Sequence, residues 1–93
     1  MTAARYRRRI PEVDAELLTL DNAEQVAAWC GGRLVDRETD GYVEQQLMIP
    51  GSAIPASLGM FVVCETEMSG RPRFYPVKAE VFGFAYEPVD DER

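Results

Sequence analysis

The sequence predicts an α+β fold in which one α-helix packs on a curved antiparallel β-sheet of about five or six strands. A helical pattern that ends in two glycines follows the first strand pattern, and several short strand patterns with turn residues between them come next. The length of 93 residues suits one domain, because so short a chain buries only roughly 60 to 65% of its unfolded surface. We therefore expect a single domain over residues 1–93, with a basic start at 1–10 and a frayed acidic tail at 89–93.

The first two elements are a strand and a helix. Residues 12–20 begin with alternating apolar and acidic side chains, which predicts a half-buried strand. Asp21 stands three residues before Glu24, as in an acidic capping box, and apolar residues at helical spacing follow, so a helix is expected over about 22–30. The pair Gly31-Gly32 then ends this helix, because glycine readily adopts the positive φ of a helix C-cap.

The middle of the chain predicts a hairpin and a packed loop. Residues 33–37 form a short strand pattern, and the Asp-Gly pair of the turn at 38–41 is typical of tight hairpins. A second strand is expected over 42–49, where it is closed by Pro50-Gly51. Residues 52–59 contain a proline and few apolar residues, which favours a packed loop over a ladder strand.

The last third predicts a hairpin and a final edge strand. The apolar run at 60–65 is too short for a core helix and rich in strand formers, so we expect a strand buried on both faces at the centre of the sheet. Turn residues at 68–72 and a returning strand at 73–76 complete the hairpin. One helical turn is expected over 77–82, and an edge strand over 84–88, where proline stops it.

The charge distribution is uneven. The formal net charge is −6, yet the first ten residues carry four arginines and no acidic residue. An acidic body repels phosphate, so nucleic acid is an unfavourable partner, although the four arginines alone could make a few salt-sensitive phosphate contacts. The simpler interpretation of these arginines is a solvated first strand whose side chains pair with nearby carboxylates.

Several catalytic classes are excluded by composition. The chain has no histidine, which removes the commonest general base, the usual metal ligand and every Ser/His or Cys/His nucleophile pair. Cys30 and Cys64 lack metal-ligand spacing, so we expect two small buried apolar residues and neither a metal nor a cofactor. No signal-peptide pattern or run of about 18 apolar residues occurs, which predicts a cytoplasmic protein with reduced thiols that does not insert in a membrane.

Three stretches resemble a small family of uncharacterised proteins encoded in phages and prophages, particularly those of actinobacteria. They are Tyr6-Arg7-Arg8-Arg9, the helical stretch from Asp21 to Gly32, and most specifically Phe74-Tyr75-Pro76-Val77-Lys78 leading to Phe82 and Tyr86-Glu87-Pro88-Val89. The family commonly has a Pro-Gly-Asp-Trp turn before the buried strand, whereas this chain has Ser57-Leu58-Gly59-Met60-Phe61. The resemblance implies a phage or prophage origin and supplies no catalytic residue.

The leading functional prediction is a non-enzymatic phage-type accessory protein that binds another protein, such as a host factor. The candidate partner-binding residues are Arg5, Arg7, Arg8, Arg9, Trp29, Phe74, Tyr75, Lys78 and Tyr86. The aromatic residues among them are core residues first, protein-contact residues second and a base-stacking platform last. Two alternatives remain open: a virion structural or decoration protein, located in the particle, and an oligomer that sequesters a small ligand. A homodimer is also expected to be possible, through an edge strand over 84–88 or through the first strand over 13–20.

Overall fold

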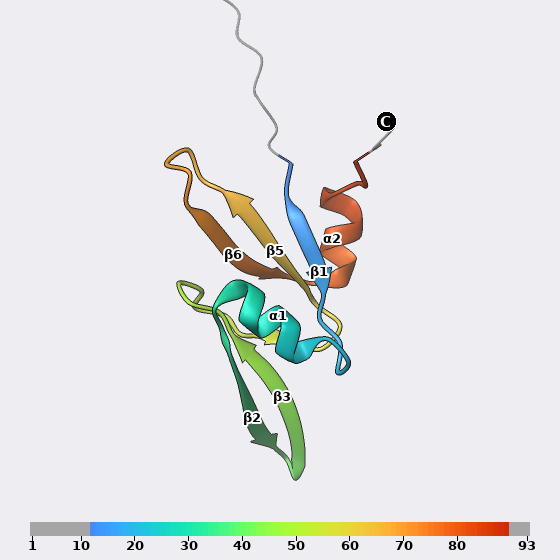
Figure 1. The fold of residues 1–93 in the computed structure, drawn as a ribbon. Coiled ribbons are helices and arrows are strands. Elements are labelled where there is room, and N and C mark those ends of the chain that lie inside the picture. The colour runs from blue at the N-terminus through green and yellow to red at the C-terminus, as the bar shows by residue number, and fades with distance from the viewer. Residues whose placement is uncertain (1–11, 90–93) are drawn as a thin grey trace, which may run out of the picture.

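The structure, a computed structural model, describes residues 12–89 and has an α+β fold (Figure 1). This part of the chain contains two helices and six strands, and the strands form two separate three-stranded antiparallel sheets, ordered β1-β5-β6 and β2-β3-β4. The prediction of a single sheet of five or six strands is therefore wrong. The elements in chain order are β1 (Asp14–Leu17), α1 (Ala23–Cys30), β2 (Arg33–Thr39), β3 (Tyr42–Met48), β4 (Ala56–Ser57), β5 (Phe61–Thr66), β6 (Pro72–Val77) and α2 (Ala79–Ala85).

Strand β5 is the centre of the first sheet, as its apolar sequence predicts. It pairs with β1 on one side and with β6 on the other, so that Val62 lies between Glu16 and Pro76. Val62 and its neighbour Val63 point to opposite faces of the sheet, and both are fully buried. Both faces of the sheet are therefore covered at its middle.

Helix α1 confirms the expected boundaries but not the expected cap. Its N-cap residue is Asn22, whose side chain makes no capping hydrogen bond to the helix and instead accepts one from the backbone N–H of Thr19, at 2.8 Å. The amide of the same side chain donates to the carbonyl of Leu17, also at 2.8 Å. The capping box expected at Asp21 is therefore wrong, because Asn22 uses its side chain to fold back the chain that leaves β1. At the other end Gly31 has φ 69, as a left-handed C-cap requires.

The second sheet is a hairpin extended by a very short strand. Asp40 and Gly41 have φ values of 49 and 80, and they form the tight turn between β2 and β3 that the Asp-Gly pair predicts. Within the expected loop at 52–59, Ala56 and Ser57 pair with β3, so this segment is partly a strand. Beyond the part of the hairpin that contacts α1, both faces are exposed, and Figure 1 shows it extending away from the rest of the molecule.

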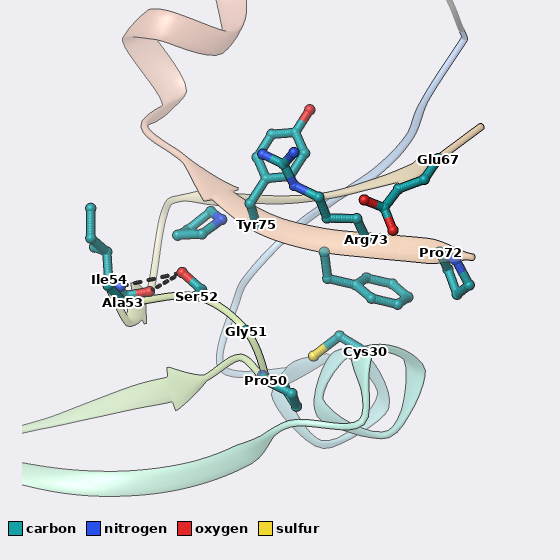
Figure 2. A pocket seen from close by; sticks show the side chains of 12 residues that line it. Cys30, Pro50, Gly51, Ser52, Ala53, Ile54, Glu67, Pro72, Arg73 and Tyr75 are labelled. Carbon is teal, nitrogen blue, oxygen red and sulfur yellow. Dashed lines mark hydrogen bonds between the residues drawn. The ribbon is translucent and has the colours of Figure 1, made fainter. Parts of the chain in front are cut away.

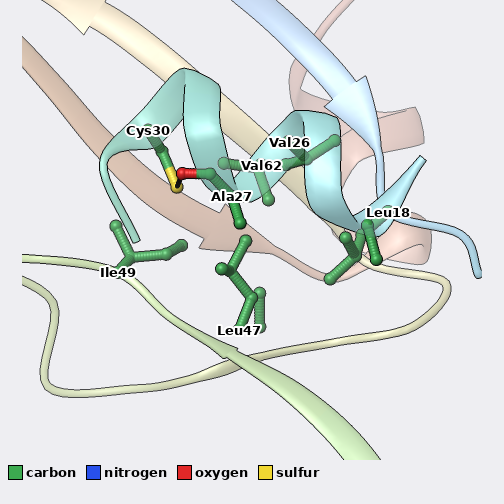
Figure 3. Packing of buried hydrophobic residues seen from close by; sticks show 9 residues of the cluster. Leu18, Val26, Ala27, Cys30, Leu47, Ile49 and Val62 are labelled. Carbon is green, nitrogen blue, oxygen red and sulfur yellow. Dashed lines mark hydrogen bonds between the residues drawn. The ribbon is translucent and has the colours of Figure 1, made fainter. Parts of the chain in front are cut away.

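The core lies around α1, between the two sheets (Figure 3). Helix α1 contributes Ala23, Val26, Ala27 and Cys30. The sheets and the segments beside them contribute Leu18, Leu47, Ile49, Ala56 and Val62. These residues belong to both sheets, so α1 joins two small sheets that could not each bury a core alone.

A glycine permits the tight junction between α1 and the second sheet. A Cβ atom at Gly32 would lie 2.6 Å from the backbone oxygen of Met48 and 2.9 Å from a side-chain carbon of Leu47. Only a residue without a side chain lets β2 leave the helix this close to β3. The second glycine of the pair is therefore required for packing, whereas Gly31 is required for its positive φ.

The C-terminal segment differs from its prediction. The edge strand expected over 84–88 is wrong, since the single helical turn expected over 77–82 continues as α2 to Ala85. The helix is held on the first sheet by stacked rings: Phe82 lies 3.9 Å from Phe61 and 4.7 Å from Tyr86, between ring centroids. Since Phe61 alternates with Val62 along β5, α2 packs on the face opposite to α1.

Candidate functional site

The outer strands of the two sheets are the surfaces that a partner could extend, because an edge strand presents unpaired N–H and C=O groups. Among the described residues the first sheet ends in β1 and β6, and the second ends in β2 and in the two-residue β4. Strand β4 is too short to form a ladder of main-chain hydrogen bonds with an added strand. The other three edges differ in how well their sequences prevent pairing.

Strand β6 is protected by prolines. The N–H of Glu67 donates to the carbonyl of Arg71, at 2.9 Å, so these two residues form a hydrogen-bonded pair next to the turn between β5 and β6. From this pair onward, hydrogen-bonded and non-hydrogen-bonded pairs alternate along the two strands. By this alternation Pro72, Phe74 and Pro76 direct their backbone groups away from β5, toward the outer edge. Two of these three positions lack an N–H, so only Phe74 can donate to an added strand.

Strand β2 is protected against its own copy by charge. The tight turn makes Thr39 and Tyr42 a hydrogen-bonded pair, so Leu34, Asp36 and Glu38 face outward. A second copy paired antiparallel and centred on Asp36 would place two aspartates opposite each other. Shifting the centre by one residue either way places arginine opposite arginine. Such like-charge pairs destabilise a sheet.

Strand β1 has neither protection at Ala15, although its next outward carbonyl, that of Leu17, already accepts a hydrogen bond from the Asn22 amide. The N–H of Leu18 donates to the carbonyl of Met60, at 2.9 Å, so Asp14 and Glu16 face β5 with their backbone groups while Ala15 faces outward. Position 15 is not a proline, and the register directs its N–H and C=O away from β5, the strand that pairs with β1. A second copy of β1 would pair Asp14 with Glu16, or either with itself, so the edge repels its own copy but not a basic strand.

A hollow of about 250 Å³ lies beside this edge, between β1 and α1. We call it the β1–α1 hollow; its lining residues are Glu16, Asn22, Gln25, Val26 and Trp29. Trp29 is 37% exposed, and its ring is held edge-on against Phe74 with centroids 5.1 Å apart. The hollow therefore combines a carboxylate, an amide and an indole ring whose position is fixed by packing.

A larger open groove lies between β6 and the segment at 50–54, next to the end of α1 (Figure 2). Its volume is about 640 Å³. The hydroxyl of Ser52 donates to the carbonyl of Ile54, at 2.8 Å, and accepts from the N–H of the same residue, which holds this segment in a compact turn. Arg73 contributes a guanidinium group that lies 5.1 Å from the ring centroid of Tyr75.

The two cysteines are poor nucleophiles. Cys30 lines the groove yet is buried, and its thiol donates to the carbonyl of Ala27 at 3.7 Å. Burial raises the pKa of the Cys30 thiol. Burial, together with the nearby carboxylate of Asp14, raises the pKa of Cys64. Both thiols are free, and Cys64 is only half-buried, which differs from the expectation of two buried residues.

The aromatic residues near the C-terminus do not form one platform. Phe74 packs against Trp29 on the α1 face, whereas Tyr75 lies on the opposite face, where its hydroxyl is 3.0 Å from that of Tyr86. Burial and this hydrogen bond raise the pKa of Tyr75 well above its usual range. Phe84, in α2, is 95% exposed. A single base-stacking surface is therefore not present in the described part of the chain.

The candidate residues named from the sequence lie in different places. Arg5, Arg7, Arg8 and Arg9 lie outside the described residues. Trp29 lines the β1–α1 hollow, Phe74 and Tyr75 line the groove, Lys78 precedes α2 and Tyr86 follows it. Sequence reasoning named the first strand, over 13–20, as an edge that could pair with a copy of itself, but it did not select Ala15 and Glu16 as partner-binding residues.

Residues 12–89 contain no group of three or more side chains suited to hold a metal ion, and no helix among them is long and apolar enough to cross a membrane. In comparisons with known proteins, no family model, no curated protein and no solved structure matches this chain.

Proposed function

We propose that this chain is a non-catalytic, phage-type accessory protein that binds another protein by accepting one of its strands at the outer edge of β1. The observation that carries the proposal is the contrast among the sheet edges. Strand β6 places prolines at two of its three outward positions, whereas β1 has an unobstructed N–H and C=O at Ala15. Strand addition obtains its affinity from such main-chain groups.

The side chains around this edge support the same conclusion. Leu17 is 41% exposed at the end of β1, and Leu20, just beyond it, is 73% exposed. Exposed apolar residues next to unpaired main-chain groups are typical of a surface that another chain covers. An added strand would bury part of this apolar surface and complete a four-stranded sheet.

Substituting Ala15→Pro tests the proposal, because it gives β1 the protection that β6 already has. Since the register directs the Ala15 N–H away from β5, the proline removes no hydrogen bond between β1 and β5, and the variant should fold with nearly unchanged stability. A photo-crosslinking residue at Leu17 should capture one partner from the host cell, and Ala15→Pro should abolish the capture. The same crosslinker at Thr39, on β2, is the matched control. Capture that persists in Ala15→Pro contradicts strand addition at β1.

The groove of Figure 2 favours a second candidate function, the sequestration of a small ligand. Its volume of about 640 Å³ lies within the range of small-molecule sites, roughly 300–1,000 Å³. Arg73 and Ser52 would supply a cation and a hydroxyl to such a ligand. A metabolite that raises the melting temperature of the native chain but not of Arg73→Ala would support this function, and flat melting curves across a broad panel would count against it.

A further inference from the structure

We propose that the strand accepted by β1 is basic, and that one of its Lys or Arg side chains enters the β1–α1 hollow. This inference rests on the proposed strand addition and adds the chemistry of the partner. The structure brings together at this edge an unpaired main-chain position, a carboxylate and an indole ring. Each of the three acts on a different part of the incoming segment.

The register of the first sheet places the incoming side chain. Glu16 lies opposite Val62, on the face that carries α1, and its backbone groups point toward β5. Across the outer edge Glu16 would therefore form a non-hydrogen-bonded pair with the added strand, the kind in which side chains approach most closely. Its neighbour on that strand would lie about 4.5–5.5 Å away between Cβ atoms, at the mouth of the hollow.

The lining of the hollow suits a cationic side chain. The Glu16 carboxylate is the group that would pair with an ammonium or guanidinium group, and the Gln25 amide oxygen can accept a further hydrogen bond. The indole of Trp29 is the strongest cation–π partner among the side chains. Since Trp29 is fixed against Phe74, the hollow is formed before the partner arrives.

The size of the hollow favours a side chain over a free ligand. Its volume of about 250 Å³ lies below the roughly 300–1,000 Å³ typical of small-molecule sites. One long side chain, anchored by the strand that carries it, needs less enclosure because the main-chain pairing already fixes its position.

The charge of the surroundings complements a basic segment. The described residues include five basic side chains, and none of them lies on β1 or α1: they are Arg33, Arg37, Arg71, Arg73 and Lys78. The acidic residues of this region are Glu12, Asp14, Glu16, Asp21 and Glu24. Among the described residues of β1 and α1 and those beside them, a basic strand would meet carboxylates and no basic side chain, whereas an acidic strand, including a copy of β1, would be repelled.

The alternation of β1 also predicts the pattern of the partner. Asp14 and Glu16 point to the α1 face, while Ala15 points to the other face, beside Val63. The partner should therefore carry basic residues at two alternate positions and an apolar residue between them. The sequence Arg5-Tyr6-Arg7 of this chain itself fits that pattern, so a second copy is the competing occupant that an experiment must separate from a different protein.

The test uses two capped synthetic peptides and the full chain. In one peptide arginine alternates with valine, and in the other glutamine replaces each arginine. We expect both to shift the backbone amide resonance of Ala15, and the arginine peptide to bind about tenfold more tightly at low salt, as a charge-assisted hydrogen bond would give. The chain has one tryptophan, so the fluorescence of Trp29 reports directly on the hollow.

Two matched carboxylate variants test whether the preference for the arginine peptide depends on Glu16. Glu16→Gln should reduce the affinity for the arginine peptide to about that for the glutamine peptide, because it removes the paired charge. Glu44→Gln removes an exposed carboxylate on β3, in the other sheet, and should leave both affinities within about twofold, because Glu44 does not line the hollow.

Each outcome has a defined meaning. Equal affinity of the two peptides, with Ala15 shifted by both, overturns the basic preference while strand addition stands. Failure of both peptides to shift Ala15 overturns strand addition itself. Binding of the arginine peptide without a change at Trp29 overturns the role of the hollow. A dimer, measured by light scattering, that dissociates when Arg5 and Arg7 are replaced by glutamine identifies a second copy as the occupant and overturns a foreign partner.

Discussion

The two sheets have the same number of strands and the same antiparallel pairing, yet they are covered very differently. The first sheet carries α1 on one face and α2 on the other, so Val62 and Val63 of its central strand are both fully buried. The second sheet is covered only where it meets α1, and the rest of its hairpin is exposed on both faces. Strand β3 contains both environments: Leu47 is fully buried, whereas Val43, on the same face, is 69% exposed.

This contrast shows where the stability of a short chain is concentrated. Residues that contact α1 carry the hydrophobic contribution, because the helix is the element that both sheets share. The exposed part of the hairpin is held by its turn and its ladder, which alone give marginal stability.

Truncation at the two ends of β3 should give the largest difference. Leu47→Ala should lower the free energy of unfolding by about 2–5 kcal/mol, because it leaves a cavity beside α1. Val43→Ala, in the same strand and on the same face, should change it by less than about 0.5 kcal/mol. Urea denaturation of both variants measures the effect, and similar losses at the two positions would show that the hairpin is covered along its whole length.

A methyl group at the junction of α1 and β2 should give the next largest effect. Gly32→Ala places its Cβ against the backbone oxygen of Met48, which cannot move cheaply, so we expect a loss of about 1–3 kcal/mol. Gly83→Ala is the control, since its Cβ would meet nothing within 4 Å and it lies inside a helix. That substitution should stabilise α2 by about 0.5–1 kcal/mol. Slower hydrogen exchange of the Tyr86 amide would confirm the gain, and unchanged stability of Gly32→Ala would refute the close junction.

The two tyrosine hydroxyls on the α2 side of the first sheet predict a dependence on alkaline pH. The pKa of Tyr75 is raised from its ordinary 10.0 by burial and by its hydrogen bond to Tyr86, so the unfolded chain loses this proton first. Stability is therefore fully present below about pH 10 and falls as the pH rises toward the folded pKa.

Tyr86→Phe removes the hydrogen bond between the two tyrosine hydroxyls and leaves the Tyr75 hydroxyl in place. Loss of the hydrogen bond should cost about 0.5–1.5 kcal/mol and make the alkaline fall in stability less steep. Tyr42→Phe is the control, because Tyr42 is 78% exposed on the hairpin. Chemical denaturation between neutral pH and pH 11 gives both quantities, and identical pH profiles for the two variants would contradict the assignment.

Much of the local structure follows from short-range sequence signals. The Asp40-Gly41 turn, the Gly31 cap and the buried strand around Val62 were all predictable, because each depends on residues close in the sequence. The separation into two sheets was not predictable in the same way. It depends on α1 lying between Leu47 and Val62, which are contacts between distant parts of the chain.

The alternation of aromatic residues near the C-terminus led to the wrong prediction of an edge strand over 84–88, where α2 continues to Ala85. Phe82, Phe84 and Tyr86 have the spacing of a strand, but Phe82 stacks between Phe61 and Tyr86, and that arrangement requires the helix. Phe84 is then left exposed, against the expectation for a large apolar residue. The strand at 13–20 was expected as an edge, but the outward direction of the Ala15 backbone groups depends on the register between β1 and β5, which the sequence alone does not give.

The pairing of β1 with β5 has a consequence for the order in which the chain assembles. Leu17 lies opposite Phe61, so α1 and the whole second sheet lie between these partners in the sequence. Closing so long a loop costs more entropy than closing the two-residue turn of the β2–β3 hairpin, and β1 should therefore join late and detach early. A strand bound to the outer edge of β1 would stabilise the state in which β1 is paired with β5. Binding of the partner and completion of the fold would then be thermodynamically coupled.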